Sequence, residues 1–176
     1  GIIRNSFFDD NLYRFIKLDG EVVKKISYRR SDLVFRFFAG VGYEFTSTVN
    51  PNNKYNLPFF LQYFAGGPNS MRAWGLRKLG PGSLVKDFGT TGQPDRYGDM
   101  QLEANIEYRF PLANVAGVKI NGAFFTDMGN IWYVKKGPDV DEKSLFKFSK
   151  LGQDLAIGAG IGFRIDFNFF VVRLDA

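Results

Sequence analysis

Residues 101–110 have the sequence Gln101-Leu102-Glu103-Ala104-Asn105-Ile106-Glu107-Tyr108-Arg109-Phe110, in which polar and apolar side chains alternate without a break. Successive side chains of a β-strand point to opposite faces of a sheet, so this segment has one charged face and one apolar face. A helical repeat of three to four residues is absent. The stretch therefore predicts a β-strand that separates two different environments.

The same alternation continues through most of the chain. Between residues 33 and 45, and again between 155 and 166, large apolar residues fall on one face while glycines and charged residues fall on the other. Six strand candidates follow from this pattern. They are residues 12–29, 32–47, 99–111, 117–133, 153–167 and 169–176. We therefore expect an all-β fold built from an antiparallel sheet.

The connections between these candidates are short at one end and long at the other. The chain turns tightly at Arg30-Ser31, within 112–116 and at Asn168, whereas 48–98 and 134–152 are long. This asymmetry is typical of outer-membrane β-barrels. The strands also reach the roughly 9–11 residues that cross a bilayer on a tilt. We expect an antiparallel transmembrane β-barrel with a long in-folded loop.

A soluble β-sandwich or a lipocalin-like barrel would also alternate. Two features favour the membrane barrel: the glycine-rich, charged face, and large aromatics near strand ends that suit an interfacial girdle. These aromatics are Tyr43, Phe45, Trp132 and Tyr133. Closed outer-membrane barrels begin at about eight strands, and an open sheet edge cannot face lipid. We therefore expect the six strands to be part of a larger barrel.

Composition excludes several other classes of function. The 176 residues include no cysteine and no histidine, which removes disulfides, thiolate and imidazole metal ligands and Ser-His-Asp catalysis. Asp139, Asp141 and Glu142 lack the ligand spacing of a calcium loop. The net charge is +5, but the basic residues are scattered. We expect no enzyme activity, no cofactor, no metal and no nucleic-acid partner.

The connection 48–98 is unusual in length and in composition. Loops of about fifty residues are rare in compact domains unless they are functional or disordered. This loop is rich in aromatic residues, which disordered segments tend to lack. Its central motif consists of Gly66, Gly67, Ser70, Met71, Arg72, Ala73, Trp74, Gly80, Pro81 and Gly82. We expect these glycines to hold the backbone in tight conformations.

Two carboxylates on the charged faces of neighbouring strand candidates are possible partners for this loop. Adjacent antiparallel strands bring Glu107 and Asp127 within pairing reach. Two like charges in a confined space need a cation, and the planar guanidinium of Arg72 suits both. Spacing alone leaves an equal alternative, in which Arg72 is solvated and the carboxylates pair with Lys119 or Arg109.

The glycines on the charged face have a simpler interpretation than ligand binding. Residues 158–162 superficially resemble a dinucleotide fingerprint, but no helix is expected after this strand. Glycine on one face of a strand more often marks the close approach of another backbone. We interpret the following glycines as leaving space in the lumen: Gly40, Gly42, Gly158, Gly160 and Gly162.

Three motifs together resemble the BamA/TamA outer-membrane assembly factors, the bacterial surface antigen family. Residues 64–74 are similar to the family's Gly-Gly…Ser-Val-Arg-Gly-Phe loop, which is followed by a Gly-Pro-Gly such as that at 80–82. Residues 104–111 are similar to its glutamate strand, and 124–132 to its Phe-Phe-x-Asp-x-Gly-x-x-Trp strand. The one departure is Ala73, where the family has glycine.

The resemblance implies a fold and a site. The family barrel has sixteen strands, so residues 1–176 are expected to be a C-terminal portion of the barrel, with the POTRA domains and the other strands elsewhere. The sixth extracellular loop of the family folds back into the lumen, where its arginine pairs with two carboxylates. By resemblance these residues are Arg72, Glu107 and Asp127, which we call the loop anchor.

The resemblance also implies a non-enzymatic insertase, integral to the bacterial outer membrane, that folds and inserts other β-barrel proteins. The expected partners are outer-membrane lipids, unfolded β-barrel clients, accessory lipoproteins or other assembly-complex subunits, and the remaining strands of the same barrel. The alternatives are a translocation pore of the two-partner-secretion type and a passive outer-membrane channel. The absence of histidine disfavours a membrane-embedded hydrolase.

Overall fold

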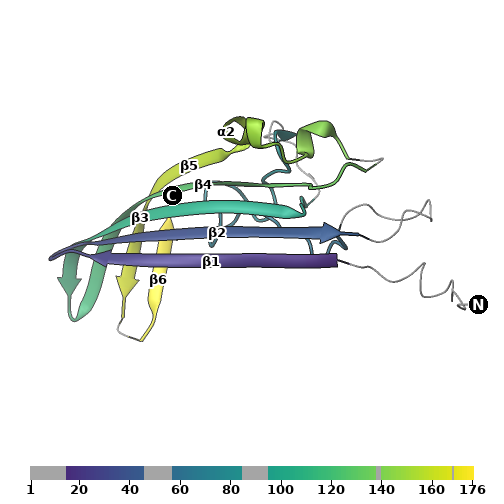
Figure 1. Ribbon diagram of the computed structural model, residues 1–176. Helices are drawn as coiled ribbons and strands as arrows, with labels where there is room; N and C mark the ends of the chain where they lie inside the picture. The colour runs from purple at the N-terminus through teal and green to yellow at the C-terminus, as the bar shows by residue number, and fades with distance from the viewer. Residues whose placement is uncertain (1–14, 46–56, 85–94, 138–139, 168) are drawn as a thin grey trace, which may run out of the picture.

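The computed structural model describes residues 15–45, 57–84, 95–137, 140–167 and 169–176. Within them one antiparallel sheet contains six strands that follow each other in chain order (Figure 1). The strands are β1 (Phe15–Ser27), β2 (Asp32–Glu44), β3 (Met100–Val115), β4 (Val118–Trp132), β5 (Ala156–Asp166) and β6 (Val171–Asp175). The described helical turns are η2 (Glu142–Ser144), η3 (Phe148–Lys150) and α2 (Leu151–Asp154). The predicted all-β antiparallel fold is confirmed.

The strand register places polar and apolar side chains on opposite faces of the sheet. Asn105 of β3 lies opposite Asp127 of β4, and Glu107 lies on the same face two residues further along. We call this side the polar face. On the other side, the apolar face, Phe124 and Ile161 are register partners and are 55% and 52% exposed. A sheet with large exposed apolar side chains on one face matches a barrel wall whose outer side meets lipid.

The hairpin of β3 and β4 is longer than the sequence predicts. The turn expected within 112–116 is instead a tight turn at Ala116-Gly117, where both residues have positive φ. The expected strand ends at residue 111, which is a proline and cannot donate to a strand ladder. In the structure the register shifts between Pro111 and Ala113, and such irregularities accommodate the missing donor. The strand therefore continues past the proline.

The other end of β4 is covered on its apolar face. Trp132 is fully buried, with its ring edge-on to Phe146 at 5.5 Å between centroids and its Nε1 donating to Asp154. The expectation that Trp132 belongs to a lipid-facing girdle is wrong, because the segment carrying these two partners covers it. This segment also forms helical turns, so β5 begins at Ala156 rather than at residue 153. No helix among the described residues is long and apolar enough to cross a membrane.

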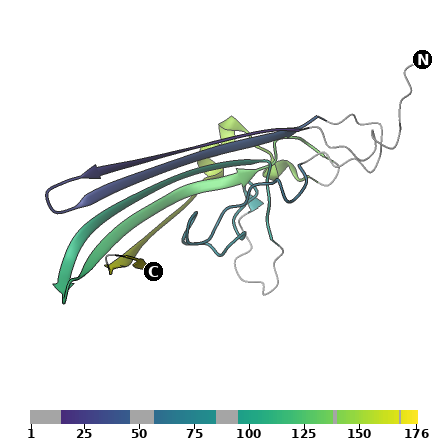
Figure 2. The same cartoon turned by 90° about the horizontal axis from the view of Figure 1, so that it is seen from below.

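The described part of the long loop lies within the curve of the sheet (Figure 2). Its apolar residues form a small buried core with one residue of β4. This core contains Tyr63, Ala65, Met71, Leu79 and Ile131. Residues 57–84 therefore behave as a packed unit, in agreement with their aromatic content. The parts of the predicted loop at 48–56 and 85–94 lie outside the described residues.

Neighbouring valines on β1 test which face meets lipid. Val22 lies opposite Phe37 on the apolar face and Val23 opposite Arg36 on the polar face, and the two are 65% and 61% exposed. In the full-length protein we predict that Val22→Lys costs about 2–4 kcal/mol of folding free energy, because lysine near the bilayer midplane is poorly solvated. Val23→Lys should cost less than about 1 kcal/mol, because lumen-facing charges stay hydrated. Urea unfolding in lipid vesicles measures both losses, and equal losses would contradict the assignment of the faces.

Candidate functional site

The loop motif is shaped by its own backbone turns. Gly67 N–H donates to Trp74 O at 2.8 Å, and Gly66 N–H donates to Ser70 Oγ at 3.1 Å. Gly66 and Gly67 have φ angles of +104° and +96°, and a Cβ on Gly66 would lie 2.2 Å from a carbonyl oxygen of the same loop. Only glycine suits such positions. The turns fold the motif so that Arg72 is presented to the sheet.

Arg72 lies with its guanidinium between two carboxylates. Its Nε and Nη2 donate to the two oxygens of Asp127 at 2.8 and 2.7 Å, and its Nη1 donates to Glu107 Oε2 at 2.6 Å. The backbone N–H of Arg72 donates to Asp127 at 3.0 Å. The side chain is 7% exposed, and its Cζ is 3.7 Å from the centre of the Phe125 ring. One guanidinium thus joins the loop to β3 and β4 through the bidentate geometry that arginine favours.

Asn105 completes the hydrogen bonding around Asp127. Its side-chain amide donates to Asp127 Oδ1 at 2.9 Å and to Ser70 O at 3.0 Å, so it links β3 to both β4 and the loop. Asp127 is fully buried. A buried carboxylate needs several donors to offset the loss of water, and Asp127 has them. The sequence analysis did not identify Asn105 as a site residue, although its position on the polar face, two residues before Glu107, could have indicated it.

Glu107 accepts hydrogen bonds from arginines of the wall as well as from the loop. Arg109 Nε and Arg164 Nε donate to Glu107 Oε1 at 2.7 and 3.0 Å. The alternative pairing with Arg109 therefore occurs together with the loop contact and does not replace it. Lys119 makes no hydrogen bond or ion pair with either anchor carboxylate in the described part of the chain. Arg164, which is 5% exposed and also donates to Asp175 at 2.6 Å, is a site residue that sequence reasoning missed.

A second polar network ties the loop to the sheet. Ser70 Oγ donates to Glu103, which also accepts from Gln101 at 2.7 Å and from Arg36 at 2.9 Å. Glu103 is 1% exposed, and Arg36 also pairs with Glu21 of β1. These contacts run across β1, β2 and β3. The loop is therefore connected to the strands beyond its three-residue anchor, through side chains that the sequence placed on the polar face but did not identify as partners.

Two glycines of β2 make room for loop side chains. A Cβ on Gly40 would lie 2.6 Å from the Tyr63 ring, and a Cβ on Gly42 would lie 2.2 Å from Leu57. The Tyr63 hydroxyl donates to Asp19 Oδ1 at 3.2 Å. Burial and the Asp19 charge raise the pKa of Tyr63, so the hydroxyl stays protonated as a donor. The glycine face of β2 is therefore a docking surface for the loop.

The glycines of β5 have two different neighbourhoods. A Cβ on Gly158 would meet the loop, 2.7 Å from the nearest loop atom. A Cβ on Gly160 would instead meet Ala176 O and the Phe125 ring of β4, and one on Gly162 would meet Asp175 of β6. Gly158 thus leaves space for the loop, whereas Gly160 and Gly162 leave space for atoms of neighbouring strands.

Ala73 stands where the resembled family has glycine. Among the described non-glycine residues only Arg77 and Ala116 have positive φ, so Ala73 needs no left-handed backbone. Its methyl group faces Gly158, and this glycine leaves space for the methyl group because it has no side chain. Beside it, Met71 is fully buried in the loop core. Alanine is therefore accommodated at this position without a positive φ.

The segment 80–82 attaches the loop to β4 at a second place. Gly82 N–H donates to Ile131 O at 2.7 Å, and Asn130 Nδ2 donates to Gly82 O at 2.9 Å. A Cβ on Gly80 would lie 2.4 Å from Ile131. The loop therefore meets β4 both at Asp127 and at its buried end.

The chemistry of the site is that of a buried ion-pair network. In the part of the chain that the structure describes, no group of three or more acidic side chains is placed to hold a metal ion. Asp139 lies outside the described residues, and Asp141 accepts from Lys143 N–H at 2.8 Å at the start of η2. What the arrangement can do is hold a loop against a wall, at the cost of desolvating several charges.

Residues 5–176 match a family model, that of the Omp85 superfamily domain. The matched range contains the loop motif and the strands that carry both anchor carboxylates. No match was found among curated proteins.

The buried and exposed carboxylates that contact the loop allow a matched stability test. Asp127→Asn in the full-length protein should reduce the unfolding free energy by about 3 kcal/mol, because it leaves a buried arginine incompletely paired. Asp95→Asn is the control, since Asp95 pairs with Arg77 and Lys78 at 3.2 Å but its side chain is 43% exposed. That change should leave the unfolding free energy nearly unchanged, because water screens an exposed ion pair. Denaturant unfolding in lipid vesicles gives both values, and equal losses would argue against the buried network.

Two glycines on neighbouring strands test the docking surface. Gly40→Val should displace the Tyr63 ring and cost about 1–3 kcal/mol, as overpacking typically does. Gly20→Val adds the same side chain where no atom lies within 4 Å of the new Cβ, so it should be close to neutral. Limited proteolysis of the folded full-length protein provides the measurement. We expect faster cleavage within residues 57–84 for Gly40→Val only, and unchanged cleavage there would contradict docking.

Proposed function

The chain belongs to the Omp85 superfamily, and from this membership we propose that it forms part of a barrel that inserts other β-barrel proteins into the bacterial outer membrane. Members of the superfamily are outer-membrane proteins that insert or translocate other proteins. Of these two activities, we propose insertion. The proposal assigns no catalytic group, because the work is done by strand pairing and lipid contact.

The observation that carries the proposal is the position of Arg72. Its guanidinium contacts Asp127 and Glu107 at 2.6–2.8 Å, and all three side chains are less than 10% exposed. Breaking such a buried network costs about 3–5 kcal/mol. The loop is thus a fixed part of the polar face rather than a loose extracellular connection. In the proposed barrel this face lines the lumen, and the loop fills part of it.

A filled lumen suits insertion better than passage through the barrel. A passive channel needs an open path, and a translocation pore needs the loop to leave its docking surface. Displacing the loop from the sheet would expose a core that includes Met71 and Leu79, both fully buried, and would unpair Arg72. An insertase needs neither an open path nor a displaced loop, since its clients enter at the barrel wall. Low conductance in planar bilayers for the full-length wild type is therefore expected, and a large open pore would favour the channel alternative.

The sheet edges and faces indicate the proposed partners. The outer edges of β1 and β6 carry no strand pairing among the described residues. Unpaired backbone is costly in lipid, so the remaining strands of the barrel are proposed to complete the wall. The apolar face meets outer-membrane lipids. Unfolded β-barrel clients would add strands by β-augmentation at the seam of the full barrel, with accessory lipoproteins assisting.

An arginine substitution tests the role of the loop anchor in assembly. Arg72→Ala in the full-length protein should lower the yield of folded client barrels at least about tenfold, since an unpaired network shifts the docked state by more than 1.4 kcal/mol. Client folding in proteoliposomes, followed by the heat-modifiable gel mobility of the client, gives the yield.

Lys78→Ala provides the control for this change. Lys78 lies in the same loop but pairs with Asp95 with a side chain that is 39% exposed, so the client yield should be unchanged. Wild-type client yield for Arg72→Ala would overturn the proposed role of the anchor. An equal loss in both variants would show that the assay responds to any change in the loop.

A further inference from the structure

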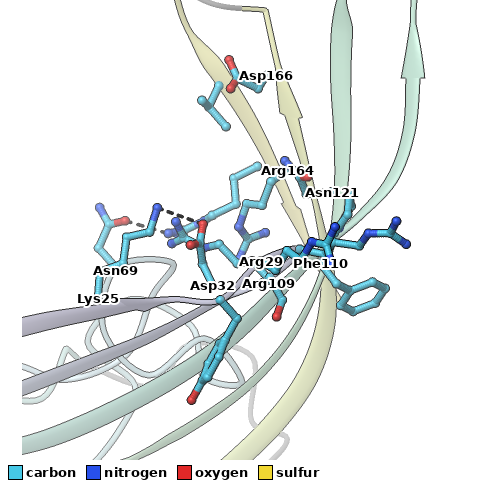
Figure 3. Close-up of a pocket in the computed structure, with 15 residues that line it drawn as sticks. Lys25, Arg29, Asp32, Asn69, Arg109, Phe110, Asn121, Arg164 and Asp166 are labelled. Atoms are coloured by element: carbon cyan, nitrogen blue, oxygen red, sulfur yellow. Dashed lines mark hydrogen bonds and ion pairs between the residues drawn. The ribbon is translucent and has the colours of Figure 1, made fainter.

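A cavity of about 900 Å³ opens at the end of the sheet where the β1–β2 turn lies (Figure 3). It is bounded by this turn, by the polar face of β3, β4 and β5, and by Asn69 of the loop. Six cationic residues line it: Lys25, Arg29, Arg30, Arg109, Arg164 and Arg173. Only two acidic residues do so, Asp32 and Asp166. We call this cavity the basic vestibule.

Four of these cations are already paired. Lys25 contacts Asp32 at 2.8 Å, Arg173 contacts Asp175 at 3.0 Å, and Arg109 and Arg164 both contact Glu107. Arg29 and Arg30 differ, because within the described residues neither makes an ion pair. Both are exposed, and they stand on the turn at the rim of the vestibule. The rim therefore holds positive charge that no carboxylate of the described chain neutralises, which favours an anionic occupant.

The vestibule belongs to the polar face and not to the face that meets lipid. Arg109 lies on the same face of β3 as Glu107, two residues away, and donates to it at 2.7 Å. Arg164 is the register partner of Asn121, while the exposed Ile161 and Phe163 occupy the other face of its strand. Lipid headgroups reach the outer surface of a barrel, so an anion here comes from the aqueous side.

The extent of the lining indicates the size of the ligand. The lining residues come from the β1–β2 turn and from each strand from β1 to β6, and neighbouring strands lie about 4.8 Å apart. From β2 to β6 this is roughly 19 Å, which is far wider than a single phosphate or carboxylate. An extended polypeptide advances about 3.3 Å per residue, so about six residues cover the same span. Arginine forks bind carboxylates bidentately, which suits aspartate and glutamate side chains.

We propose that the basic vestibule binds an acidic segment of polypeptide, in extended form, through Arg29 and Arg30. Arg109 and Arg164 of the vestibule donate to Glu107 of the loop anchor, but neither Arg29 nor Arg30 contacts Arg72, Glu107 or Asp127. Binding at the rim is therefore separable from docking of the loop. The proposal stands whether the full barrel inserts or translocates its clients.

The test uses the full-length protein in detergent micelles and a fluorescent peptide of about eight residues that alternates glutamate and serine. A peptide with glutamine in place of glutamate is the uncharged control. Fluorescence anisotropy at low salt should show at least about tenfold tighter binding of the acidic peptide, with the preference falling as salt rises. Arg29→Gln/Arg30→Gln should remove most of this preference.

The matched control is Lys136→Gln/Lys150→Gln, which removes two exposed cations far along the chain from the vestibule. It should leave the preference for the acidic peptide intact. Heat-modifiable mobility checks that each variant is folded, and Arg29 and Arg30 lie in a turn where glutamine is tolerated. Equal affinity for the two peptides, or equal loss in both double variants, would overturn the proposal. Full competition by inorganic phosphate at matched charge would overturn the polypeptide assignment in favour of a simple anion site.

Discussion

The ion pairs of Arg72 with Asp127 and Glu107 are the constraint on which the described arrangement of loop and sheet depends. They join a segment far from both strands in sequence to the centre of the polar face, and none of the three side chains is accessible enough to be satisfied by water. A buried charge without its partner is strongly destabilising. The backbone turns of the loop, the Asn105 amide and the wall arginines all act to keep these three groups in one geometry.

Glycines in the sheet leave space for the loop around this contact. Gly40, Gly42 and Gly158 remove side chains where Tyr63, Leu57 and the Ala73 methyl group pack, so the loop approaches the strands closely. The same approach excludes water from the network and strengthens each ion pair. Glycine weakens a strand because it packs poorly, yet here the loop supplies the missing contacts. Packing and electrostatics therefore depend on each other at this site.

Part of this could be predicted from the sequence. The strict pattern of β3 and β5 identified the faces, whereas the need for a cation between two carboxylates left two equal alternatives, and only the family resemblance selected Arg72. Arg164 was not recognised, because its partner is set by strand register, which a single sequence does not reveal. The predicted strand end at residue 111 was too early for a similar reason, since a bulge that accommodates proline depends on the partner strand. Trp132 was predicted to belong to the interfacial aromatic girdle. The segment that covers it, which carries Phe146 and Asp154, has no alternating or helical pattern that would have predicted the contact.

We predict that the Arg72 and Asp127 side chains are energetically coupled in the folded barrel. A double-mutant cycle measures this directly, with Arg72→Ala, Asp127→Ala and the double variant unfolded by urea in lipid vesicles of the full-length protein. Contacting residues in one network have coupling free energies of about 0.5–3 kcal/mol, and a buried bidentate pair belongs at the upper end of that range. We predict a coupling above about 1 kcal/mol. Additive losses, with a coupling near zero, would contradict the account.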